Sequence, residues 1–179
     1  MKLLNSKNII FIGLFIAIII ACGFIRISVF AVPFTLQTLA VMLAACFLGL
    51  KRAMLAVIIY IAMGLIGLPV FTKGGGIFYV FELSFGYILG FFPITLITAV
   101  FKGKAKKNFF MLFVIISAAS LCGLLTGAVY AYFLLQYTSQ AGSIAMVFSA
   151  FFITFIPAEL LKSLAAAALY FRMKSRYIA

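Results

Sequence analysis

The chain has 179 residues, of which 68% are hydrophobic and only 9% are charged. A soluble domain of this length could not hide so much apolar surface, so the composition excludes a soluble globular protein. The net charge of +12 comes from cations that are spread over short segments between apolar stretches, and this spread argues against nucleic-acid binding.

Six apolar stretches follow one another along the chain, and each is a candidate membrane-spanning helix. We expect them at residues 9–25, 36–50, 53–71, 77–101, 109–135 and 144–171. A spanning helix needs about 20 residues, so the helix of the short second stretch should begin within 32–36 or bury one end in the bundle. The sequence therefore predicts an all-α integral membrane bundle of six transmembrane helices, with residues 1–179 forming a single domain.

The basic residues predict the orientation of this bundle. Cytoplasmic segments carry excess Lys and Arg. Six crossings put eleven cations on one side: Lys2, Lys7, Lys51, Arg52, Lys102, Lys104, Lys106, Lys107, Arg172, Lys174 and Arg176. The other side has only Arg26 and Lys73, while Lys162 falls inside the last stretch. We therefore expect both termini to be cytoplasmic.

Both acidic residues, Glu82 and Glu159, lie inside apolar stretches. A charge in hydrocarbon costs at least about 2.5–3.5 kcal/mol, so such residues usually mark a ligand or ion site. Lys162 follows Glu159 by three residues and shares its helix face, which leaves a structural ion pair as the alternative. Glu82 has Lys73 or Lys162 as a possible counterion, or a place near the outer interface. Pro157 should kink or restart the last helix.

Other polar side chains gather near the outer ends of the second and fourth stretches. Thr35, Gln37 and Thr38 follow Pro33, and they offer hydroxyls and an amide. Glu82, Gly86 and Gly90 would share one face of a helix, with Ser84 and Tyr87 beside it. The candidate substrate-binding residues are Thr35, Gln37, Glu82, Ser84, Tyr87, Glu159 and Lys162.

Two further motifs are rich in small residues. Lys73, Gly74, Gly75 and Gly76 form a loop that is either a flexible connector or a gate over an outward-facing pocket, where backbone can approach closely. Gly13, Ala17 and Ala21 recur at a spacing of four and form one stripe on the first helix. Such a stripe serves packing inside the bundle or docking of a partner membrane protein.

Several functions are excluded by missing residues. The chain has no histidine, so a Ser-His or Cys-His nucleophile is impossible, and its three cysteines form no CxxC. No P-loop motif occurs, so the chain cannot hydrolyse ATP itself. We expect no enzyme activity, no cofactor and no metal, although a Ser-Lys dyad using Lys162 stays formally open.

These stretches together resemble the BioY family, the biotin-specific S components of energy-coupling factor (ECF) transporters. The most specific part is Val32-Pro33-Phe34-Thr35-Leu36-Gln37-Thr38-Leu39-Ala40, and Gly67-Leu68-Pro69-Val70-Phe71 and Gly86-Tyr87-Ile88-Leu89-Gly90-Phe91 follow. Pro157 to Lys162 is similar to the family's Pro-Gly-Asp-x-x-Lys, and Ala17-x-x-x-Ala21 to its AxxxA signature. The resemblance implies a multi-pass subunit of a prokaryotic cell membrane. It would bind biotin at its outer face and work with an ECF transmembrane coupling protein and two cytoplasmic ATPases.

The chain also departs from the family pattern. Glu82-Leu83-Ser84-Phe85-Gly86-Tyr87 stands where the family usually has Gly-Pro-Thr-Gly-Gly-Tyr, and Ala158-Glu159 replaces Gly-Asp. These departures leave dethiobiotin and lipoate open as substrates. A stand-alone transporter with Glu159 as proton carrier is the rival mechanism. In the binding hypothesis, Glu159 and Ser84 contact the ureido ring, and Arg26 and Lys73 attract the carboxylate. Lys162 would either form an ion pair that orients Glu159 or bind the ligand carboxylate.

Overall fold

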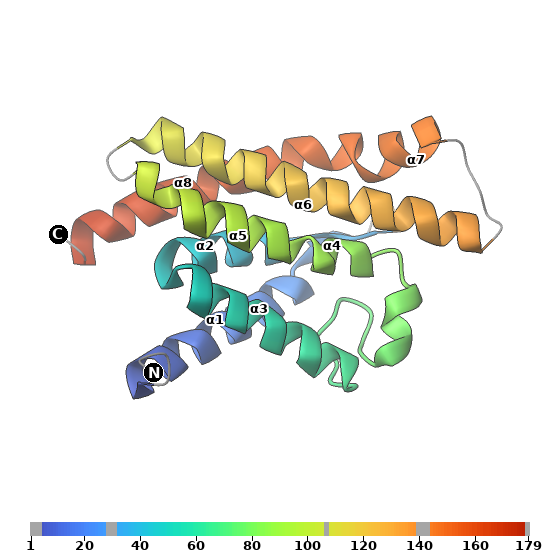
Figure 1. Cartoon of the computed structure of the whole chain (residues 1–179), viewed down its shortest axis with the longest axis horizontal. Coiled ribbons are helices and arrows are strands. Elements are labelled where there is room, and N and C mark those ends of the chain that lie inside the picture. The colour runs from blue at the N-terminus through green and yellow to red at the C-terminus, as the bar shows by residue number, and fades with distance from the viewer. Residues whose placement is uncertain (1–4, 28–31, 106–107, 139–143, 178–179) are drawn as a thin grey trace.

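The computed structural model of the chain describes residues 5–27, 32–105, 108–138 and 144–177. Within these residues the α-helices are α1 (Ser6–Phe24), α2 (Gln37–Leu48), α3 (Leu50–Leu65), α4 (Phe85–Leu89), α5 (Phe91–Phe101), α6 (Phe109–Tyr137), α7 (Ile144–Phe151) and α8 (Ile156–Tyr177). Short 3-10 helices add η1 (Ile77–Phe81), η2 (Lys102–Ala105) and η3 (Ile153–Phe155). The strands β1 (Arg26–Ile27) and β2 (Phe34–Thr35) pair antiparallel, with Arg26 opposite Thr35. Figure 1 shows the long helices lying side by side in one bundle.

The all-α membrane bundle expected from the sequence is confirmed. Four helical stretches of the described chain are long and apolar enough to cross a membrane: Ser6–Phe24, Phe85–Ala105, Phe109–Tyr137 and Met146–Lys174. α2 is apolar but shorter. It begins at Gln37 and not within 32–36, and eight of its twelve residues are buried, so the short helix lies largely inside the bundle.

The expected fourth helix, 77–101, is broken. The chain forms η1, then an extended residue at Glu82 and a turn, and the α-helix starts only at Phe85. Glu82 therefore does not share a helix face with Gly86 and Gly90, which corrects that expectation. The last stretch is broken at η3. Pro157 lies in the first turn of α8, where a backbone N–H would have no partner inside the helix, so the missing proline N–H costs no hydrogen bond.

α4 and α5 pack against α6 through glycines. A Cβ added at Gly90 would lie 2.4 Å from the carbonyl oxygen of Gly123, and one at Gly86 would lie 2.4 Å from the Cβ of Tyr130. At Gly90, where α4 meets α5, the chain approaches α6 so closely that backbone contacts backbone. Such contact through small residues is common between helices in lipid. This contact positions the wall of the candidate site that α4 provides.

The stripe of Gly13, Ala17 and Ala21 faces outward. All three residues are exposed, and a Cβ added at Gly13 would meet nothing within 4 Å. The small residue that packs α1 inside the described bundle is Gly23, where an added Cβ would lie 2.6 Å from Nε2 of Gln37. Packing among the described residues therefore does not account for the stripe.

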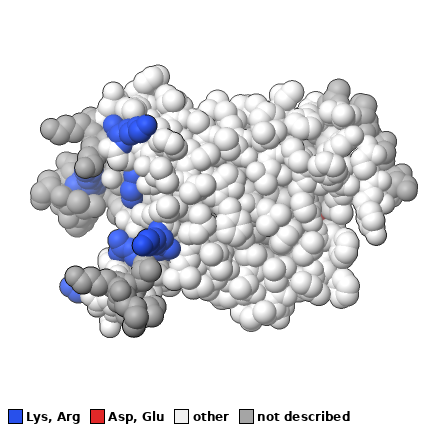
Figure 2. All heavy atoms as spheres, viewed as in Figure 1, with Lys and Arg blue, Asp and Glu red and all other residues white. Residues whose placement is uncertain are grey.

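The charges are divided unequally between the two ends of the bundle. Figure 2 shows that the visible Lys and Arg side chains gather at one end, where α1 begins and α8 ends in Figure 1. Lys102 belongs to this end and donates to the carbonyl oxygens of Ala45 and Cys46 at 3.1 and 2.5 Å. A cation there satisfies carbonyls at the C-terminal end of α2.

Candidate ligand-binding site

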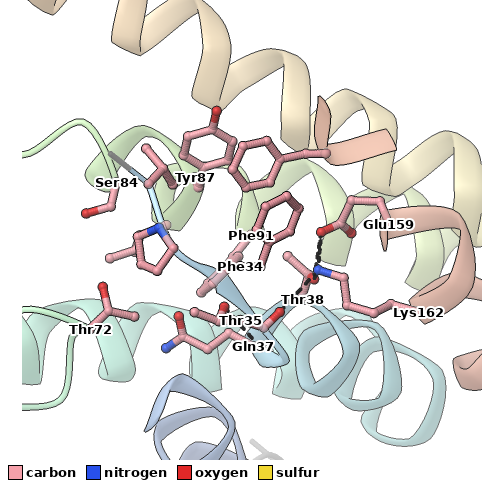
Figure 3. A pocket seen from close by; sticks show the side chains of 14 residues that line it. Phe34, Thr35, Gln37, Thr38, Thr72, Ser84, Tyr87, Phe91, Glu159 and Lys162 are labelled. Atoms are coloured by element: carbon pink, nitrogen blue, oxygen red, sulfur yellow. Dashed lines mark hydrogen bonds and ion pairs between the residues drawn. The ribbon is translucent and has the colours of Figure 1, made fainter. Parts of the chain in front are cut away.

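A small cavity lies between β2, α2, α4, α5, η3 and α8 (Figure 3). Its wall includes the sequence-predicted residues Thr35, Gln37, Ser84, Tyr87, Glu159 and Lys162. In Figure 3, Glu159 and Lys162 lie on one side, Ser84 and Thr72 lie on the other, and Phe34 and Phe91 lie between them. The cavity thus has two polar ends and an aromatic middle.

Glu159, Lys162 and Thr38 form a closed triangle at the first polar end. The Lys162 ammonium forms an ion pair with Glu159 Oε1 and donates to Thr38 Oγ1 at 2.6 Å. Thr38 in turn donates to Glu159 Oε1 at 3.0 Å. The carboxylate side chain is only 5% exposed and the ammonium side chain 11%, so both charges are held in a nearly dry environment.

The three N–H donors of Lys162 are all used within the chain. The third donates to the backbone carbonyl of Thr35 at 3.2 Å. Because an ammonium has only three protons, this lysine has none left for a ligand carboxylate while the triangle is intact. In this conformation Lys162 therefore pairs with Glu159.

The second carboxylate oxygen of Glu159 has no partner. Oε2 is buried and receives no hydrogen bond from any described residue. A buried charged acceptor without a donor is costly, so its presence in a cavity wall indicates a site for a ligand N–H or O–H, or for water.

Hydroxyl groups form the second polar end. The Tyr79 hydroxyl lies 2.9 Å from Thr72 Oγ1 and 2.9 Å from Ser84 Oγ, so it links two wall residues. Gln37 is also fixed, since its Nε2 donates to the Tyr60 hydroxyl at 2.7 Å. These bonds hold the polar side chains of the wall in place before any ligand arrives.

Aromatic rings form the middle of the cavity. Phe34 stacks on Phe155 with 4.2 Å between ring centroids, and the Tyr87 ring lies 5.6 Å from the Phe155 ring. The Tyr87 hydroxyl donates to the carbonyl oxygen of Phe151, which ties α4 to the end of α7. This surface suits an apolar portion of a ligand.

Glu82 was expected at the site but does not line the cavity. Because it precedes the first turn of α4, its side chain reaches the surface and pairs with Lys73, with 2.6 Å between Nζ and Oε2. The two side chains are 46% and 40% exposed. Lys73 also lies outside the cavity wall, but its neighbour Thr72 is part of it. Arg26 is exposed on β1.

The glycine run packs on the chain's own backbone. A Cβ added at Gly75 would lie 2.1 Å from the carbonyl oxygen of Leu68, and the Gly76 N–H donates to the carbonyl of Gly64 at 2.7 Å. Gly74 and Gly76 have φ values of 115° and 109°, which favour glycine. The run closes a tight return between α3 and η1, and gating by Lys73, Gly74, Gly75 and Gly76 stays a prediction.

Sequence reasoning left several wall residues out of the candidate site. Thr38 stood next to two chosen residues, and its bonds to Glu159 and Lys162 appear only when α8 packs on α2. Phe34 and Phe91 lay inside two of the family-like motifs, whereas Thr72 and Phe155 carry no signal beyond their residue type in an apolar chain. Within the described residues no group of three His, Cys, Asp or Glu side chains could hold a metal ion.

The cavity is small in this conformation. Its accessible volume is about 50 Å³. Pockets for organic ligands usually measure about 300–1,000 Å³, so the walls must separate before a vitamin-sized molecule can enter.

An all-helical membrane bundle around a cavity with two polar ends defines a membrane subunit that binds a small molecule. The chain belongs to the BioY family, whose model matches residues 1–179. It is 33% identical over 175 residues to a probable biotin transporter BioY of Lysinibacillus sphaericus, covering 97% of this chain and 89% of the relative. It is 35% identical over 173 residues to the biotin transporter BioY of Thermotoga maritima, covering 94% and 96%.

A solved structure has the same fold. The crystal structure of the S-component for biotin from an ECF-type ABC transporter superimposes with a TM-score of 0.82 at 25% identity, covering 98% of this chain and 95% of that one. The relatives are named as transporters, in agreement with the expectation of a transport subunit.

Proposed function

We propose that this protein is the biotin-binding S component of an ECF-type transporter. The observation that carries the proposal is the free Oε2 of Glu159 at one end of an aromatic cavity. Biotin presents ureido N–H donors at one end, an apolar ring and chain in the middle, and a carboxylate at the other end. The names of the relatives and of the matching structure support the same ligand.

The carboxylate of Glu159 favours a cyclic urea over lipoate. The dithiolane ring of lipoate has no N–H, so it would leave Oε2 buried and unpaired. Sites built around a buried hydrogen-bonding group reject analogues that lack the complementary group. Dethiobiotin retains the ureido ring and is therefore the closer competitor.

In this proposal Lys162 orients Glu159, and it does not bind the ligand carboxylate. Its three hydrogen bonds hold Oε1 toward Thr38, so Oε2 is the oxygen left for the ligand. Thr35, Gln37, Ser84 and Tyr87 would shape the rest of the wall.

The basic end of the bundle is proposed to face the cytoplasm, and both termini with it. An excess of Lys and Arg marks that side of a membrane protein. The exposed stripe of Gly13, Ala17 and Ala21 is proposed to dock the ECF transmembrane coupling protein, which would work with two cytoplasmic ATPase subunits.

The test is a titration of the purified full chain, in detergent at fixed salt, with biotin, dethiobiotin and lipoate in parallel. We expect the tightest binding for biotin, weaker binding for dethiobiotin and no measurable binding for lipoate. Preference for lipoate would contradict the role given to Glu159. Absence of binding to all three would overturn the proposed function.

A further inference from the structure

We infer that Lys73 is the counterion of the ligand carboxylate, and that Glu82 forms an ion pair with Lys73 when the site is empty. This specificity role rests on the proposed function, because it concerns the anionic end of the same ligand. It assigns a purpose to an ion pair that lies outside the cavity but next to its wall.

At the Glu159 end of the cavity, the described residues leave no cationic donor for a ligand carboxylate. Lys162 is the cation that the described wall contains, and its three protons are committed to Glu159, Thr38 and Thr35. A carboxylate brought to that end would also lie beside the carboxylate of Glu159, and like charges at such a distance repel. The anionic end of a ligand therefore belongs at the other polar end.

The Lys73–Glu82 ion pair lies beside the other polar end of the cavity. Thr72 and Ser84 form it, and they lie across the aromatic middle from Glu159 (Figure 3). Lys73 follows Thr72 directly, and Glu82 precedes Ser84 by two residues, so the ion pair bridges the two segments that supply this end. The Tyr79 hydroxyl fixes both segments through its 2.9 Å contacts.

The Lys73–Glu82 ion pair is weak enough for a ligand carboxylate to replace Glu82. At 46% and 40% exposure the Lys73–Glu82 contact is well solvated, and exposed pairs of this kind are weak. A ligand carboxylate can therefore take the place of the Glu82 carboxylate at low cost. The Lys73 ammonium has three protons and donates one to Glu82, so it can hold both carboxylates during the exchange.

The experiment compares biotin with neutral biotinamide on the purified full chain at low and fixed salt. Unmodified protein should bind biotin more tightly than biotinamide. Lys73→Gln should weaken biotin binding about three- to fivefold and leave biotinamide binding unchanged. Glu82→Gln should strengthen biotin binding about two- to fivefold, again without effect on biotinamide.

Two other cations, Lys104 and Arg26, serve as controls. Lys104→Gln removes a cation from η2 at the basic end and should change neither ligand. Arg26→Gln tests the other outer cation. A biotin preference that survives Lys73→Gln, or that disappears in Arg26→Gln instead, would overturn the inference. So would a Glu82→Gln protein that loses both ligands equally. Failure of the unmodified protein to bind either ligand would instead contradict the proposed function.

Discussion

In the proposed function, ligand recognition depends most on the side chain of Glu159. Its Oε1 is held by Lys162 and Thr38, while Oε2 has no partner among the described residues. One oxygen therefore anchors the side chain and the other is available for a ligand. The division depends on Thr38, which joins the carboxylate to α2.

Glu159→Gln should weaken biotin binding by about 10- to 150-fold, the range expected for losing a hydrogen bond to a charged acceptor. The amide also leaves Lys162 without its counterion, so a lower thermal stability is expected. Equilibrium titration with biotin measures the first effect and thermal unfolding the second. Glu82→Gln is the comparison variant, because it removes a carboxylate outside the cavity and should strengthen biotin binding where Glu159→Gln weakens it. Affinity of Glu159→Gln within about twofold of the unmodified protein would contradict the assignment.

For single residues, the sequence predicted which polar side chains line the cavity better than it predicted their hydrogen-bond partners. Glu159 and Lys162 stood out because charges are rare in this chain, and Ser84 and Gln37 stood out for similar reasons. Glu82 stood out equally, yet it lies on the surface. The difference depends on where α4 begins, and residue type alone does not reveal that.

The contact between α4–α5 and α6 depends on glycine at a few positions. The backbone oxygen of Gly123 is only 2.4 Å from where a Cβ on Gly90 would lie, and a backbone atom cannot rotate away. A side chain there forces the helices apart and displaces Ser84 and Tyr87 with α4.

Gly90→Ala should lower the free energy of unfolding by about 1–3 kcal/mol, as overpacking of a filled interior does. Gly13→Ala is the control, since its added Cβ meets nothing within 4 Å and alanine is the better helix former. Thermal unfolding of the two variants in the same detergent measures the difference. Equal stability of both would show that the glycine contact is not required.

The exposed stripe on α1 leads to a prediction about partners. Ala17→Trp should abolish co-purification with the coupling protein and biotin uptake by cells, because a large side chain prevents close approach of another helix. Biotin binding by the purified variant should stay unchanged. Leu125→Trp, on an exposed position of α6, is the control and should keep both activities. Uptake retained by Ala17→Trp would contradict docking at the stripe.

Element boundaries were predictable where a helix is long and uninterrupted. The expected 9–25 and 109–135 correspond closely to α1 and α6. The expected 77–101 was wrong as a single helix, because η1 and the turn before Phe85 interrupt it. In 144–171 the interruption at η3 lies directly before Pro157, where a kink or restart was expected. Apolar composition is the same on both sides of these breaks. At η1 the Tyr130 hydroxyl donates to the carbonyl of Val80, a tertiary contact across 50 positions that composition does not reveal.

The whole molecule has one basic end, and this asymmetry predicts its orientation. In a variant whose three cysteines are replaced, Leu68→Cys in the loop after α3 should react with an impermeant maleimide in intact cells. Lys104→Cys in η2 should react only after the membrane is opened. Gel shift of the labelled protein measures both reactions. The reverse pattern would place the termini outside the cell.

The site joins parts of the chain that are made at very different times. Lys162 bonds to Thr35 across 127 positions, and Thr38 bonds to Glu159 across 121. During synthesis the cavity residues that precede α8 are therefore made before Glu159 and Lys162, and the site is incomplete until α8 is inserted. Glu159 and Lys162 enter together on one helix, so their charges offset each other during insertion. A ribosome that stops before α8 leaves a chain without a ligand site, and only finished molecules can be stabilised by bound vitamin.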